Sequence, residues 1–191
     1  MIMETIVTTR AGNGHTHIAP MGMREQDGLI ILAPFRPSRS LDNMRREGSA
    51  IINYTDDVRV FSGCLTGHRD WPLCPAAKVS GHRLENCLSH VELKLEHVKD
   101  DEQRPELLFR PVYEATHAPF CGFNRAQAAV IEASVLVSRL HILPWEKIES
   151  EIDYLAISIA KTAGPREQLA WDWLMQRIAE FRAQQHEERL A

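Results

Sequence analysis

The sequence lacks the short motifs that mark the common enzyme classes. No glycine-rich nucleotide loop, nucleophile elbow, HExxH helix or zinc-ribbon spacing occurs in its 191 residues. A long apolar run is missing too. The most apolar stretch, residues 126–140, contains Gln, Glu, Ser and Arg, and it is shorter than the roughly 20 residues that a membrane-spanning helix needs. We therefore expect no membrane segment and no enzyme of these motif-defined classes.

Positive charge and cysteine are also scarce. Lysine and arginine total 22 against 26 acidic residues, a net charge of −4, so the chain has no basic field for a nucleic-acid backbone. Four cysteines stand at irregular spacings without a CxxC pair, and the first residues show no charged-then-apolar signal pattern. We expect reduced thiols, a cytoplasmic location and no binding to nucleic acid.

Histidine is more frequent, with nine residues, and raises the question of a metal site. Cys74, His82, Cys87 and His90 are close enough in sequence to coordinate one ion. Their spacing matches no regular metal site, and the alternative is that they are scattered through a loop and a strand. On this basis the sequence predicts no metal site.

The remaining composition, 44% hydrophobic and 25% charged, is typical of a folded globular chain, and the length suits either one ample domain or one domain with a small appendage. Alternation, β-branched residues and turn signals predict a meander of strands followed by a short helix that Ser40 caps and Gly48 ends. The predicted strands are Met3–Arg10, His15–Met23, Leu29–Ala33, Ala50–Tyr54, Ser89–Lys99 and Glu106–His117.

Other segments have different patterns. Residues 66–86 show no periodicity and are predicted to be irregular. After Gly122 the pattern becomes helical: apolar residues from Trp145 to Ile159 recur at spacings of three and four, and Pro165 is placed to open a further helix. The last third of the chain is therefore predicted to be a small helical subdomain.

The connection between Phe35 and Asn43 carries the strongest chemical signal. It places the guanidinium groups of Arg36 and Arg39 and the hydroxyls of Ser38 and Ser40 just before a helix, where unpaired amides and the helix dipole favour an anion. This pattern predicts a phosphate site. The alternative is that Ser40 only caps the helix and both arginines are solvated.

Five segments of the chain also form one larger pattern. They are Glu4-Thr5-Ile6-Val7-Thr8-Thr9, Ile18-Ala19-Pro20-Met21-Gly22, Pro34-Phe35-x-x-Ser38-x-Ser40-x-x-Asn43, Ile52-Asn53-Tyr54-Thr55-Asp56-Asp57-Val58 and Gly122-Phe123-Asn124-Arg125-Ala126. The pattern resembles the FMN-binding split-barrel proteins, which are flavin reductase-like, and within them the domain-of-unknown-function family 447. Threonine is common in that family at the position of Ser40, and serine keeps the hydroxyl.

The resemblance implies an α+β fold, a six-stranded antiparallel split β-barrel over residues 1–121 with a C-terminal helical subdomain over residues 122–191 packed on it. It also implies an FMN cofactor and a homodimer. The residues it assigns to FMN are Ala19, Met21 and Gly22 beside the ring, Phe35 and Arg36 along the approach, Ser38, Arg39, Ser40 and Asn43 at the phosphate or ribityl chain, and Asn53, Thr55 and Asp56 in a second motif.

Several of these residues have simpler explanations. A bend in the sheet accounts for Ala19 and Gly22. A strand end with a helix cap accounts for Asn53, Thr55 and Asp56, and capping is the favoured explanation for Asn124. The resulting functional hypothesis is an FMN-dependent oxidoreductase or flavin reductase-like enzyme acting on an unidentified small molecule. The alternatives are a non-catalytic FMN carrier or sensor and a partner-binding protein with an empty barrel.

Overall fold

The computed structural model describes residues 1–190, with side chains described up to residue 187. The chain forms two compact units. The barrel unit combines Met1–Asp56 with Asp70–Phe120, and the helical unit combines Asp57–Arg69 with the residues from Cys121 onward. The segment Asp57–Arg69 therefore belongs to the same unit as the C-terminal helices. The division expected from the sequence, with residues 1–121 in one domain, assigned this segment to the barrel.

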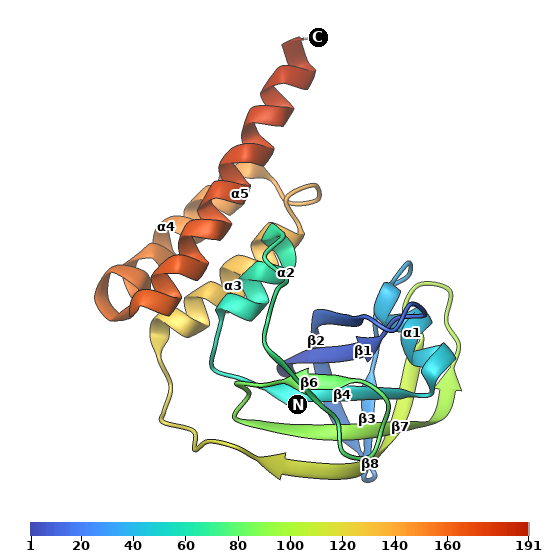
Figure 1. The fold of residues 1–191 in the computed structure, drawn as a ribbon. Coiled ribbons are helices and arrows are strands. Elements are labelled where there is room, and N and C mark those ends of the chain that lie inside the picture. The colour runs from blue at the N-terminus through green and yellow to red at the C-terminus, as the bar shows by residue number, and fades with distance from the viewer. Residues whose placement is uncertain (191) are drawn as a thin grey trace. The chain divides into compact units, whose positions relative to one another are not determined.

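The barrel unit is a closed barrel of six antiparallel strands in the order β1-β2-β3-β8-β7-β4 (Figure 1). This confirms the predicted fold class. The strands are β1 Met3–Arg10, β2 Thr16–Gln26, β3 Leu29–Leu32, β4 Ser49–Tyr54, β7 Ser89–Lys99 and β8 Glu106–Thr116. Strand β2 runs three residues beyond the predicted end because Asp27 and Gly28, with φ of 54° and 75°, form the tight turn to β3.

The barrel core follows from the alternation of the strands, which directs every second side chain inward. Val7, Leu32, Ile52, Leu93 and Phe109 are fully buried there. Strand β4 pairs with β1 on one side and with β7 on the other, so it closes the barrel between segments far apart in sequence.

Helix α1, Arg39–Glu47, packs against β1, β2 and β4 and adds Leu41 and Met44 to the barrel core. Its end at Gly48, in the left-handed region, is as predicted. The predicted cap was wrong: Ser38, not Ser40, is the N-cap. Ser38 is the last residue with an extended backbone, and its Oγ accepts a hydrogen bond of 3.3 Å from the amide of Leu41.

Residues 66–86 are only partly irregular. They include a two-stranded sheet of β5, Leu73–Pro75, and β6, His82–Leu84. The prediction missed this sheet because three residues are too few to show an alternating pattern. The amide of Leu84 donates to Oδ1 of Asn53 at 2.7 Å, so this two-stranded sheet, the β5–β6 ribbon, is hydrogen-bonded to strand β4.

The helical unit contains α2 Arg59–Thr66, α3 Arg125–Ser138, α4 Trp145–Thr162 and α5 Pro165–Leu190. Asn124 caps α3 by accepting from the amide of Ala126 at 2.7 Å, as expected. The core of this unit is built from alanine, valine, isoleucine and leucine with Trp171. Among the described residues, no helix has the length and apolar character needed to cross a membrane.

Candidate functional site

The start of α1 is the part of the predicted phosphate site that has the right chemistry. The amides of Arg39 and Ser40, the first two of the helix, have no partner inside it because the helix has not yet begun behind them. The Arg39 side chain is exposed beside them, and the helix dipole adds partial positive charge. These groups form a local receptor for an anion such as a phosphate.

Arg36 lies in a different environment from Arg39. Its Nη2 is 3.1 Å from Oδ1 of Asp100, and its Nε donates to the carbonyl of Asp101 at 3.2 Å. Arg45 binds the same Asp100 carboxylate, and the hydrogen bond from Arg45, with the added charge of Arg36, lowers the pKa of Asp100. Arg36 is therefore already paired inside the chain, so Arg39 is the more available of the two predicted arginines.

The turn between β7 and β8 holds this connection from the other side. Arg104 Nε donates to the carbonyl of Ala33 at 2.9 Å, and its guanidinium lies 4.7 Å from the centre of the Phe35 ring. Phe35 is 63% exposed, so its other ring face is open. A depression of about 440 Å³ beside this turn is lined by Arg36, Asp100, Asp101 and Glu102, and three acidic residues make it unsuitable for a phosphate.

Two predicted contacts of the phosphate or ribityl chain point into the protein. Asn43 is buried, its Nδ2 donates to Thr9 Oγ1 at 3.0 Å, and its Oδ1 accepts from Arg46 at 3.0 Å. Ser40 is 2% exposed. Asn43 therefore joins α1 to β1, and its amide group is already engaged at both ends.

Asn53 is fully buried and has a similar structural role. Its Nδ2 donates to the carbonyl of Ile6 at 3.1 Å and lies 3.3 Å from Thr8 Oγ1, while its Oδ1 accepts from Leu84. One side chain thus links β1, β4 and β6. Thr55 and Asp56 follow β4 directly and are partly exposed, so they are the members of the second motif that a ligand could reach.

The three small or flexible residues of β2 lie opposite β1. Ala19 pairs with Val7, Met21 with Thr5 and Gly22 with Glu4. Met21 packs partly against the barrel core. A Cβ at Gly22 would meet the side chain of Ile2 at 2.9 Å, so the N-terminal residues cover the face that Gly22 leaves open.

The structure therefore divides the predicted residues into two groups. Ser38 and Arg39 at the start of α1, with Phe35 before it, are at least partly exposed, whereas the amides of Asn43 and Asn53 support the barrel. Sequence reasoning missed Asp100 and Arg104, which hold the connection in place. Their only signal was the charged turn at residues 100–104 between two strands.

Comparison with solved structures finds the same fold in flavin-related proteins. An FMN-bound protein from Methanosarcina mazei matches with a TM-score of 0.79 at 19% identity, over 92% of this chain and 94% of that one. The 2-nitrobenzoate 2-nitroreductase of Pseudomonas fluorescens matches with a TM-score of 0.52 at 19% identity, over 60% and 64%. The flavin reductase component of a bacterial two-component tryptophan halogenase matches with a TM-score of 0.51 at 15% identity, over 62% and 82%.

Comparison with protein families covers most of the chain, whereas no curated protein matches it. The N-terminal domain model of the protein of unknown function DUF447 matches residues 3–118. The second model of the same family matches residues 124–176. The barrel order, the start of α1 and these two consecutive matches agree, and the chain belongs to the DUF447 family.

Proposed function

We propose that this protein binds FMN in its barrel unit and acts as a flavin reductase-like oxidoreductase on a small molecule. The observation that carries the proposal is the exposed Arg39 at the first position of α1, where its amide, its guanidinium and the helix dipole favour an anion. The FMN-bound family member from Methanosarcina mazei, which shares the fold over 92% of this chain, supports FMN as the source of that anion.

The residues present fit the phosphate of FMN. That group carries about −1.5 to −2 charges near neutral pH and three acceptor oxygens. Helix N–H groups point out of the N-terminal end of the helix and a guanidinium donates through a planar fork, so both suit a phosphate better than they suit an uncharged sugar. In this arrangement the amide of Arg39 binds the phosphate at the positive end of the helix dipole, and the Arg39 side chain neutralises its charge.

The rest of the cofactor is expected along β2 and the end of β4. When bound, FMN supplies the redox chemistry, and the protein contributes position and electrostatics. The backbone near Met21 and Gly22 is the predicted hydrogen-bonding partner of the ring, and the Ile2 side chain would move aside to admit it. Because the sequence has no dinucleotide-binding fingerprint, a nicotinamide donor would react from a position over the ring.

The test of binding compares FMN with riboflavin, which shares the ring and ribityl chain but lacks the phosphate. The purified protein is expected to quench the fluorescence of both flavins. The titration with FMN should saturate at about one FMN per chain. Charge-assisted hydrogen bonds contribute about 1.5–3 kcal/mol each before desolvation, so FMN should bind about 10²–10³ times more tightly. Equal affinities for FMN and riboflavin would mean that the phosphate does not bind at the start of α1. If the fluorescence of neither flavin is quenched, the proposal is refuted.

Turnover separates an oxidoreductase from an FMN carrier or sensor. The FMN-loaded protein is mixed anaerobically with NADH or NADPH, and the loss of flavin absorbance is followed over time. Reduction that saturates with donor and is faster than reduction of free FMN supports the enzyme. Reduction no faster than that of free FMN with every donor would favour the carrier.

We also propose a homodimer in the cytoplasm, without nucleic-acid partners. The tryptophans of the helical unit do not supply the reason, since Trp171 is buried and Trp173 stacks on His68 at 3.9 Å. The proposal rests on the resemblance to split-barrel proteins, and Ile142 and Tyr154, which are 69% and 72% exposed, are apolar side chains available for such a contact. Sedimentation should give twice the 21.7 kDa chain mass, and a single species of 21.7 kDa at micromolar concentration would contradict it.

A further inference from the structure

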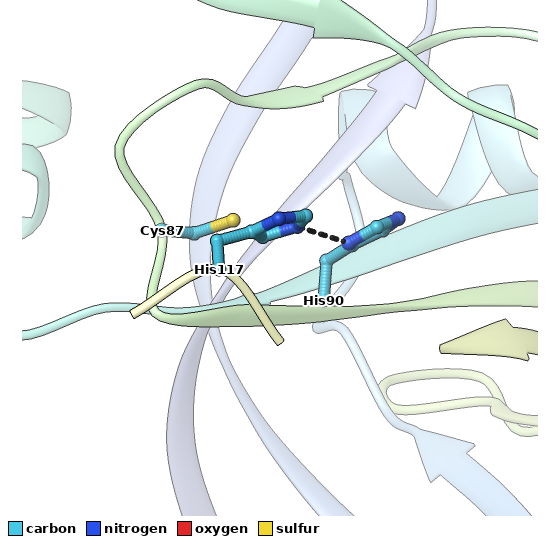
Figure 2. A group of neighbouring side chains, drawn as sticks. All are labelled: Cys87, His90 and His117. Atoms are coloured by element: carbon cyan, nitrogen blue, oxygen red, sulfur yellow. Dashed lines mark hydrogen bonds between the residues drawn. The ribbon is translucent and has the colours of Figure 1, made fainter. Parts of the chain in front are cut away.

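Three potential metal ligands meet at one end of the barrel unit (Figure 2). Cys87 follows β6, His90 lies on β7, and His117 comes directly after β8. One ligand atom from each residue lies within 4.8 Å of the others. The ring of His117 lies between the Cys87 thiol and His90, whose Nδ1 is 2.9 Å from His117 Nε2.

Glu92 determines which nitrogen of His90 faces this cluster. Its Oε1 is 3.3 Å from His90 Nε2, and both side chains are buried, with exposures of 0% and 3%. A carboxylate only accepts hydrogen bonds, so Nε2 carries the ring proton and Nδ1 presents its lone pair to Cys87 and His117. This arrangement of carboxylate, histidine and open nitrogen is the one that orients histidine ligands in metal sites.

The Glu92 carboxylate is itself held in the charged form. The amides of Ala77, Lys78 and Val79 donate to it at 2.6, 2.6 and 3.0 Å. These three donors leave the carboxylate fixed in place behind the His90 ring. A fixed negative charge behind His90 strengthens that ring as a ligand.

The three ligand atoms have the identity that zinc prefers, and small side-chain movements would bring their spacing to that of a zinc site. Zinc binds imidazole nitrogen at about 2.0–2.1 Å and thiolate sulfur at about 2.3 Å, which in a tetrahedral site separates the ligand atoms by about 3.3–3.6 Å. The shortest observed separation, 2.9 Å, and the upper limit of 4.8 Å lie on either side of this range. His117 is exposed, so one side of the cluster is open.

We propose that Cys87 Sγ, His90 Nδ1 and His117 Nε2 bind one zinc-like divalent cation, with the fourth position open on the side of His117. Three protein ligands and one open position are the composition of catalytic rather than structural zinc sites. The sequence analysis predicted no metal site. It considered His82, whose ring instead lies 3.1 Å from Thr16 Oγ1, and it omitted His117.

Binding changes the protonation of two ligands. Without the ion, the Cys87 thiol donates a hydrogen bond to the carbonyl of Leu84 at 3.2 Å. With His90 protonated at Nε2, the N–H at His117 Nε2 donates a hydrogen bond to His90 Nδ1. With the ion, Cys87 releases its proton to solvent, and the His117 proton moves from Nε2 to Nδ1 through water. One proton is therefore released for each ion bound. Arg83, whose Nη1 is 4.0 Å from the sulfur, favours the thiolate but opposes the cation.

The test uses Zn²⁺ and Co²⁺ on the purified full-length protein. Zn²⁺ in competition with a chromophoric chelator is expected to bind at one equivalent per chain. Co²⁺ in the same site should show a sulfur-to-cobalt charge-transfer band and tetrahedral d–d bands. Neither readout involves flavin or turnover, so the result stands whether or not the protein binds FMN.

Matched variants locate the site. Cys87→Ser should abolish the charge-transfer band, whereas Cys121→Ser, which removes an exposed thiol elsewhere, should leave it unchanged. His117→Ala, a change at an exposed residue, should weaken Zn²⁺ binding by about 100-fold or more, and Glu92→Gln by about 10–100-fold. Wild-type affinity equal to that of His117→Ala, or a cobalt spectrum that survives Cys87→Ser, would overturn the proposal.

Discussion

Backbone amides face a negative charge at two places in the barrel unit. Between β5 and β6, three successive amides converge on the buried carboxylate of Glu92. At the start of α1, the exposed residue Arg39 offers its amide and guanidinium at the surface, and the proposed anion comes from a cofactor. The same device thus operates within the chain at Glu92, and the proposed function would use it for a ligand at α1.

The difference lies in what each amide set stabilises. Glu92 is 0% exposed, so its hydrogen bonds form away from water and join the β5–β6 connection to β7. Removing a buried acceptor leaves the amides without any partner. The start of α1 is exposed, where water can replace a ligand at little cost. The buried set should therefore control stability, and the exposed set should control binding.

The largest expected effect is on stability. Glu92→Ala leaves three amides and His90 without their acceptor, and we expect a loss of about 3–5 kcal/mol in the free energy of unfolding. Urea denaturation followed by circular dichroism measures it. Arg39→Ala is the control and should stay within about 0.5 kcal/mol of wild type. Similar losses in both variants would remove the distinction between the two amide sets.

The second effect is on the choice between FMN and riboflavin. Arg39→Ala should reduce the preference for FMN by about 10-fold, the equivalent of one charge-assisted hydrogen bond. Arg36→Ala should reduce it by less than about threefold, because Asp100 and Asp101 already hold that guanidinium. Fluorescence titration of each variant with both flavins gives the ratios. A larger loss from Arg36→Ala would mean that Arg36 leaves Asp100 to bind the phosphate.

The smallest effect concerns a carboxylate held by side chains on the surface. The hydrogen bond from Arg24 lowers the pKa of Glu106 from 4.5. A pKa that is lower in the folded state stabilises the protein above the unfolded value, and the stabilisation is lost as the pH falls through the folded value. We expect Glu106→Gln to cost about 0.2–1 kcal/mol near neutral pH.

That difference should vanish once the pH is well below 4.5, which urea denaturation at several pH values would reveal. Higher salt should also reduce it, because both partners are about one-third exposed. A difference that stays constant from neutral to acid pH would show that packing, and not the charge pair, is responsible.

Local sequence signals predicted most of the elements. Strand β1 has the predicted bounds Met3–Arg10, Gly48 ends α1 and Pro165 opens α5, because each depends on the conformational preferences of a few neighbouring residues. The predicted N-cap of α1, Ser40, lies two residues after the observed one, Ser38. Ser38 and Ser40 have the same capping chemistry, and only the backbone conformation distinguishes them.

Contacts between distant segments could not be predicted in this way. His117 reaches His90 because β7 and β8 pair with His90 opposite Ala115, which places the residues after Thr116 beside the cluster. That register includes two irregular positions, and no short window of sequence encodes it. The structural contacts of Asn43 and Asn53 were likewise not predictable, because their partners Thr9 and Leu84 are about 30 residues away in the sequence. The sequence therefore left a ligand as the predicted partner of both side chains.

The closed barrel also bears on how the chain avoids aggregation. The six strands form a closed ring, but β3 has only four residues, so it pairs with β2 only over Met23–Gln26 and with β8 only over Leu107–Phe109. The two-stranded β5–β6 ribbon does have free edges, but each strand has only three residues, and Pro75 in β5 lacks an amide hydrogen. The longer open edges lie beyond the reach of β3, in the first part of β2 and the last part of β8, and each contains a proline, Pro20 or Pro111, that cannot donate a ladder hydrogen bond to an added strand.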